Sequence, residues 1–193
     1  QREIFSQFLN EKEKIRKKFG KDAMVLESEL NKLRNQKGQN FFQAFELSIR
    51  HHNALNSGAP AFERMWHFWG NHFSLSNKDF ISDWHYGPYM REAIRPSMNK
   101  TFEEMVVEVT TSWGMIHHLD NTDNIGPNSQ DGRRENSDGD KKKVGLNENH
   151  ARELLELHTV SPAANYTQDD VINMAKVLTG WAKKWSKKNL WAG

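Results

Sequence analysis

The side chains best suited to chemistry are concentrated in residues 147–159, where Asn, Glu, Arg and His are interspersed with leucines. At about 100° per residue, four of them share one face of a helix: Asn149, Arg152, Glu153 and Glu156. His158 falls on the opposite face, with the leucines. Arg152 stands four residues after Glu148 and four before Glu156, the spacing at which helical ion pairs form. This face predicts either a ligand or catalytic site or a structural ion-pair network, and the sequence leaves both open.

A functional site would give these side chains, and a few from elsewhere, three different roles. The candidate catalytic residues, as bases or proton carriers, are Glu153, Glu156 and His72. The candidate ligand-binding residues, which include arginines that could clamp a carboxylate or sulfate group, are Asn149, Arg152, Arg64 and Asp120. The candidate metal ligands, drawn from different helices, are His158, His72 and Asp120. The cofactor is unknown, and a divalent metal is the one that these residue types suggest.

Structural interpretations compete with each of these roles. A buried His158 could bond a backbone carbonyl, Asp120 could cap a helix end, and Arg64 could be a salt-bridge hub. Glu156 and His158 lie on different faces, so they form no compact metal motif, and the chain has no His-Glu-x-x-His pattern. The absence of cysteine excludes thiolate metal sites and cysteine nucleophiles. The absence of a Gly-rich phosphate loop and of Gly-x-Ser-x-Gly argues against nucleotide binding and serine hydrolysis.

Composition restricts the partners. The net charge of +2 over 193 residues is nearly balanced, so we expect no nucleic-acid partner, and we interpret the lysine clusters at 141–143 and 183–188 as solvated charges. No apolar run approaches ~18 residues, so we expect no membrane span. No secretory signal is visible. The chain starts at Gln1 in the middle of a helical pattern and stops abruptly at Gly193, so we expect it to be a fragment.

The elements that must position these residues show helical periodicity of their apolar residues. No segment shows the regular alternation of apolar and polar residues that is typical of a strand. Apolar spacing predicts helices from Ile4 to near Gly20, from Met24 to near Gly38, from Phe41 through Ile49, and over residues 86–94 up to Pro96. The clearest helix begins at Pro60, and its aromatic stripe is typical of a core: Phe62, Met65, Trp66, Trp69 and Phe73.

Two capping signals mark later helices. Thr101 with Glu104 predicts a capping box and a helix whose buried side extends to Ile116. Thr167 opens the last helix, which Gly180 can end. Residues 122–145, rich in Asn, Asp, Gly, Ser and Lys, predict a long flexible polar loop.

The expected fold is therefore all-α, a single multi-helix domain resembling an orthogonal bundle with a long polar loop. Its expected parts are charged N-terminal helices at 1–38, the core at 39–182 and a basic tail at 183–193.

Three segments resemble the bacterial family called domain of unknown function 1800 in order, spacing and residue types. They are residues 61–73, His118-Leu119-Asp120-Asn121, and residues 145–159, the last continued at 166–171 and 178–181. The resemblance covers roughly residues 40 to 182. The chain has Gly70 where the family tends to have His, Trp113-Gly114 where it tends to have His-Pro, and Ser161-Pro162-Ala163-Ala164-Asn165 where a Gly-rich stretch is usual. We therefore expect a fragment or a degenerate member.

The resemblance implies a helical bacterial protein of the cell envelope or export route, with a sulfatase-like partner protein, and it implies no reaction. Two hypotheses follow. In the first, the Arg/Glu/Asn/His cluster binds a small ligand or a divalent cation, with hydrolytic activity in one version. In the second, the protein is a non-catalytic helical scaffold or interaction module and the cluster is a structural salt-bridge network. Whether the protein is an enzyme stays open.

Overall fold

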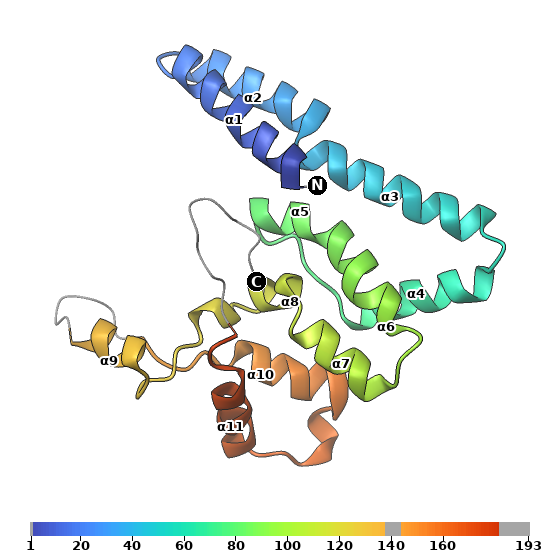
Figure 1. The fold of residues 1–193 in the computed structure, drawn as a ribbon, viewed down its shortest axis with the longest axis vertical. Coiled ribbons are helices and arrows are strands. Elements are labelled where there is room, and N and C mark those ends of the chain that lie inside the picture. Colours follow the sequence, from blue (N-terminus) through green and yellow to red (C-terminus); the bar gives the residue numbers. More distant parts are fainter. Residues whose placement is uncertain (1, 138–143, 182–193) are drawn as a thin grey trace. The chain divides into compact units, whose positions relative to one another are not determined.

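The chain is seen in a computed structural model that describes residues 2–137 and 144–181. Within these residues every regular element is a helix, which confirms the all-α prediction (Figure 1). No helix in the described ranges is long and apolar enough to cross a membrane. The lysine clusters at 141–143 and 183–188 and the predicted tail at 183–193 lie outside the described residues.

The chain divides into two compact units, the first formed by residues 1–64 and 77–87. Its elements are α1 (Arg2–Phe19), α2 (Ala23–Lys37), α3 (Gln39–Asn56), the start of α4 (Pro60–His72) and most of α5 (Phe80–Pro88). The indole of Trp84 is fully buried at its centre. The rings of Phe5, Phe8 and Phe42 lie 4.9, 5.5 and 4.8 Å from it, centroid to centroid. In this division residues 39–64 group with the N-terminal helices.

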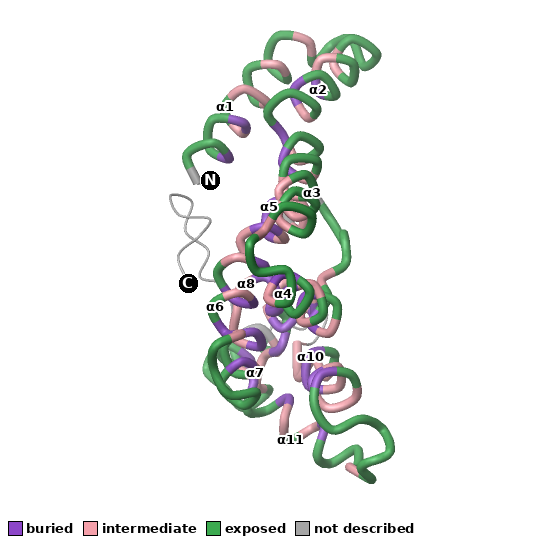
Figure 2. The backbone as a smooth tube through the Cα atoms, turned by 90° about the vertical axis from the view of Figure 1, so that its right-hand side faces the viewer, coloured by how far each residue is buried: buried purple, intermediate pink, exposed green. Residues whose placement is uncertain are grey.

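The second unit, residues 65–76 and 88–193, holds all but one of the candidate site residues. After the rest of α4 come the π-helix η1 (Tyr89–Ile94), α6 (Arg95–Ser97), α7 (Phe102–Thr110), α8 (Trp113–His118) and the 3-10 turn η2 (Asn121–Asp123). They are followed by α9 (Gln130–Asn136), α10 (Asn149–Glu153), the π-helix η3 (Leu154–Thr159), the 3-10 turn η4 (Pro162–Ala164) and α11 (Gln168–Leu178). Buried residues recur among exposed ones along α7 and α11 (Figure 2), as expected of amphipathic helices that pack by one face.

The aromatic helix α4 contributes core residues as predicted. Trp66 and Phe73 are buried, and the Trp66 indole donates a hydrogen bond to the Met90 carbonyl at 2.9 Å. Met65 differs from the prediction because it is 46% exposed. A Cβ on Gly70 would lie 2.3 Å from the Met90 Cε, so the space that a larger residue would need is filled by Met90.

The helix predicted over 86–94 is longer than expected. It begins at Phe80, passes through Pro88 and continues as the π-helix η1 into the short α6, which contains Pro96. The Arg95 N–H donates to the Met90 carbonyl, five residues back. A proline inside a helix removes an i→i−4 hydrogen bond, and here the chain accommodates it through a π-turn and does not stop.

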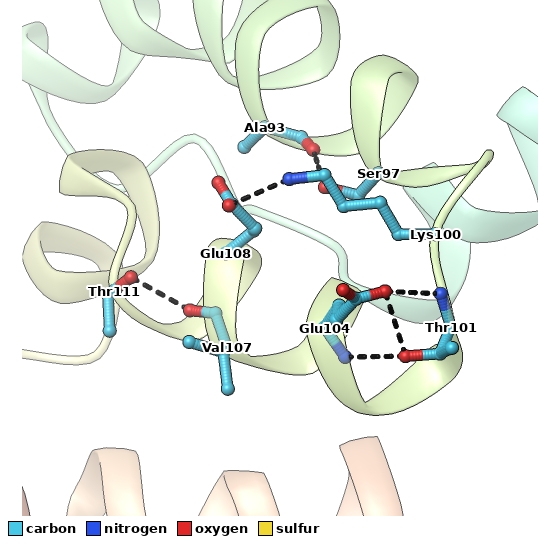
Figure 3. Close-up of polar contacts among 8 residues, drawn as sticks. All are labelled: Ala93, Ser97, Lys100, Thr101, Glu104, Val107, Glu108 and Thr111. Atoms are coloured by element: carbon cyan, nitrogen blue, oxygen red, sulfur yellow. Dashed lines mark hydrogen bonds and ion pairs between the residues drawn. The ribbon is translucent and has the colours of Figure 1, made fainter.

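Helix α7 begins where the capping box predicts. The Thr101 N–H donates to the Glu104 carboxylate at 2.9 Å, and the Glu104 N–H donates to Thr101 Oγ1 at 3.2 Å (Figure 3). The predicted continuation to Ile116 is wrong, because α7 ends at Thr110 and Ser112 caps a separate α8. The hydroxyls of Thr111 and Ser112 donate to backbone carbonyls of α7 and so compete with further helical bonds.

The polar segment 122–145 is also not wholly a loop. It contains helix α9, whose N-cap Ser129 accepts a hydrogen bond from the Gly132 N–H at 3.0 Å. Glycine and asparagine disfavour a helix interior, so this short helix depends on its cap more than on the propensity of its residues.

Candidate functional site

The Arg152 cluster, formed by Arg152, Glu148, Glu156 and Gln168, is the polar hub of the second unit. The guanidinium donates to the Glu148 carboxylate at 3.0 Å and to the Glu156 carboxylate at 3.2 Å, which confirms the predicted i,i+4 pairs. It also donates to the Gln168 amide oxygen at 2.9 Å, and the Gln168 amide nitrogen donates to Glu148 at 2.8 Å. The hydrogen bond with Glu156 is the main cause that raises the pKa of Arg152. The cluster therefore ties α10 to the first turn of α11.

Tyr166 extends this cluster. Burial and a hydrogen bond with Glu156 raise the pKa of its phenol above the ordinary value. Glu156 consequently has two partners within the chain, Arg152 and Tyr166. Glu153, predicted on the same face, is half-buried and is not among the residues that bond Arg152.

A change of helix type explains the positions of the residues that follow. The helix is α-helical only to Glu153, and from Leu154 its hydrogen bonds span five residues, as in the 3.2 Å bond from the Val160 N–H to the Leu155 carbonyl. A π-turn holds more residues than an α-turn, so side chains beyond Leu154 rotate away from the 100° phase assumed from the sequence. Such turns are frequent at functional sites, and no sequence signal for this one was available.

Asparagines form a second polar network, which the sequence analysis missed. Asn121 and Asn124 are buried, and the Asn124 amide donates to Asn121 Oδ1 at 3.2 Å and to the Ala175 carbonyl at 2.8 Å. The Asn121 amide donates to the Leu178 carbonyl at 3.0 Å. These bonds satisfy the carbonyls at the C-terminal end of α11, where no helical partner is left.

The same network reaches the start of α10. The Asn147 N–H donates to Asn124 Oδ1 at 3.0 Å, and its amide donates to the Asp120 carbonyl at 3.2 Å. Asn149, predicted to bind ligand, donates instead to the Leu119 carbonyl at 3.2 Å. Asp120 has φ 56°, a left-handed conformation that aspartate tolerates. The motif letters Leu-Asp-Asn and Asn-Glu-Asn were the available signal, but they do not indicate which side chains meet.

Histidines gather on the other side of α10 and η3. The His72 ring nitrogen Nε2 donates to the His158 carbonyl at 3.0 Å, and the two rings lie 6.0 Å apart. His150 and His158 are buried, and burial lowers the pKa of each to about 4. Both imidazoles are therefore neutral at pH 7. His158 is buried as predicted, and a hydrogen bond with the His72 backbone counteracts part of the fall in its pKa, while its Nδ1 has no hydrogen-bond partner among the described residues.

The remaining predicted residues are distributed as follows. The structure brings His72 and His158 together, while Asp120 contributes its backbone to the asparagine network. Arg64 is exposed and belongs to the first unit. Within the described ranges, no three His, Asp or Glu side chains are grouped so that they could hold a metal ion.

An open groove lies beside the Arg152 cluster, between η3, η4 and α11. We call it the η3–α11 groove; its volume is about 450 Å³. Its apolar lining residues are Leu155, Val160, Ala164, Met174 and Val177. Its polar lining residues are Tyr166, Asp170 and Asn173. The sequence could not indicate it, because the groove depends on how the chain turns at Ser161 before returning to α11.

A family model described as "Protein of unknown function (DUF1800)" matches residues 2–191, which confirms the resemblance of the three segments and extends it to nearly the whole chain. No curated protein and no solved structure matches the chain.

Proposed function

The chain belongs to the DUF1800 family of proteins of unknown function, and we propose that it is a non-catalytic helical interaction module. In this proposal the Arg152 cluster is a structural network that locks α10 to α11. One observation carries it: the Arg152 guanidinium bonds three side chains of its own protein, Glu148, Glu156 and Gln168.

The chemistry of the cluster supports a structural role. A general base needs a carboxylate that is free to take a proton, whereas Glu148 and Glu156 each pair with Arg152. An anion clamp uses the N–H donors of the guanidinium fork, and Arg152 already gives Nη1 to Glu156 and Nη2 to Glu148 and Gln168. A ligand at these two nitrogens would therefore compete with three side chains of the protein itself.

The second candidate function is binding of a small ligand or a divalent cation, with hydrolysis as its catalytic form. The neutral state of His150 and His158 favours it, because the neutral imidazole is the form that ligates metals. Under this hypothesis His72, His158 and Asp120 would move together around the ion, and Glu153 or Glu156 would serve as base.

Replacement of Arg152 by glutamine separates the two candidates. The structural role predicts a small but measurable fall in Tm, because the substitution removes two partly exposed ion pairs and the hydrogen bond to Gln168 together. Arg134→Gln is the matched control, because Arg134 and Asp131, which pair at 3.5 Å, both have highly exposed side chains.

Metal titration completes the test. We expect zinc and manganese to leave the Tm of the wild-type protein unchanged. Three results together overturn the proposal. Either ion raises the Tm of the wild type, His158→Asn abolishes that rise, and Arg152→Gln is as stable as the wild type.

The cell-envelope location and the sulfatase-like partner implied by the resemblance fit an interaction module. We include both in the proposal. Co-expression of the two proteins in a bacterial host, followed by purification through a tag on one of them, tests the partnership. Recovery of the tagged protein alone would remove the partner from the proposal.

A further inference from the structure

We infer that the η3–α11 groove binds a small ligand with an apolar body and one protonated amine. This inference rests on the proposed function and gives the interaction module a ligand class. Nothing in it requires a reaction at the Arg152 cluster.

The size and lining of the groove support an apolar body. Ligand pockets are typically about 300–1,000 Å³ and mostly apolar, with a few polar groups that orient the ligand. The groove has about 450 Å³. Val160 and Val177 at its edge are 48% and 69% exposed, so an apolar ligand would remove apolar surface from water that the protein itself does not cover.

The charge on the lining supports an amine. Asp170 is the charged residue among the described residues that line the groove. Its Oδ2 accepts from the Thr167 N–H and hydroxyl, both at 2.7 Å, and these bonds lower its pKa. Asp170 is therefore ionised at neutral pH, and its Oδ1 is left to accept a charge-assisted hydrogen bond from an ammonium group.

The Arg152 cluster holds one wall of the groove in place. Tyr166 lines the groove and is bonded to Glu156, which is bonded to Arg152. On the same side the Ser161 N–H donates to the Leu155 carbonyl at 2.9 Å. A wall that is ordered before the ligand arrives loses little conformational freedom on binding.

The test uses three probes of one length, octylamine, 1-octanol and octanoate, added to the full chain below their aggregation concentrations. Amide chemical shifts of Leu155 and Met174 report binding. We expect octylamine to bind at least tenfold more tightly than octanol, and octanoate more weakly than octanol. In Asp170→Asn the affinity for octylamine should fall to that for octanol, whereas Asp169→Asn, which changes the neighbouring acid in the same helical turn, should keep it.

Asp170→Asn also weakens the N-terminal cap of α11, so a second variant tests the groove without changing that cap. Val177→Lys places a cation at the exposed edge and should weaken octylamine binding at least tenfold, while Val107→Lys on α7, also exposed, should not. Equal affinity for all three probes, or no shift at Leu155 and Met174, overturns the inference. If Arg152→Gln keeps its Tm while octylamine binds as expected, the structural role proposed for the cluster fails and the ligand class survives.

Discussion

At the residue scale, the polar side chains of the second unit find partners both near to them and far from them in the sequence. Arg152 meets Glu148 and Glu156 because residues four apart are neighbours on any helix. The bonds of Asn121 to residues near 180 join segments that are far apart in the sequence, and only the fold specifies them. Residue types therefore identified a polar hub and its ion pairs, but they did not indicate that the Asn149 amide donates to the Leu119 carbonyl.

Ser161 stores backbone strain that a glycine would release. Its φ of 68° and ψ of 158° fall in a region that only glycine adopts readily, at a cost of about 1–3 kcal/mol for other residues. Glycine also increases the entropy of the unfolded chain, by about 0.4–1 kcal/mol. The relief of strain exceeds the entropic cost of the glycine. We therefore expect Ser161→Gly to raise the free energy of unfolding, measured by urea denaturation, by roughly 1 kcal/mol.

The matched control for this prediction is Ser57→Gly. Ser57 accepts the same i+2 hydrogen bond, from the Ala59 N–H, but has an ordinary φ of −67°. This control should lose stability. Equal effects of the two substitutions would show that Ser161 is not strained.

At the element scale, helix starts were predictable and changes of helix type were not. The capping box at Thr101 and the helix start at Thr167 lie where the sequence places them, because a cap needs only residues three apart. The π-helices η1 and η3 and the break between α7 and α8 depend on packing against other elements and on side chains that compete for carbonyls.

The asparagine network gives the prediction that belongs to this scale. Asn124 bonds Asn121, the Ala175 carbonyl and the Asn147 N–H, and so joins η2, α11 and the segment before α10. Asn124→Ala leaves buried polar groups without partners, at about 1–3 kcal/mol each. We expect a loss of roughly 2–4 kcal/mol in urea denaturation. The exposed Asn128→Ala should change stability by less than about 0.5 kcal/mol, and a similarly small effect at Asn124 would show that the network does not stabilise the unit.

At the scale of the whole molecule, composition and periodicity were sufficient for the all-α class. The near-uniform helical spacing and the lack of alternating segments exclude a sheet before any contact is known. The division into two units was not predictable in the same way, since it depends on which distant segments pack together, such as residues 77–87 with the first 64. Burial of particular histidines is a property of this same packing, and it makes the stability of the molecule depend on pH.

His150 and His158 should make the protein less stable in mild acid. Burial, with a smaller contribution from neighbouring histidines, lowers the pKa of both to about 4; the neighbours are His158 and His118 for His150, and His72 and His118 for His158. In the unfolded chain a histidine titrates near 6.5, so between about pH 6.5 and 4 the unfolded state binds more protons than the folded state. Stability is complete above this window and falls as the pH decreases through it, by up to about 1.4 kcal/mol per pH unit for each histidine.

Urea denaturation at half-unit steps of pH measures this slope. His150→Gln should reduce the slope between pH 6 and 4.5 by about one proton, because one of the two buried imidazoles is removed. His52→Gln replaces an exposed histidine of α3 and should leave the slope unchanged. Protonation of carboxylates with a lowered pKa, such as Asp170 and Glu104, also destabilises the protein, but only at lower pH. The difference in slope between the wild type and His150→Gln therefore isolates the histidine. A slope that is the same in His150→Gln and in the wild type would mean that this imidazole is already protonated in the folded protein, and that the histidine cluster is solvated and not buried.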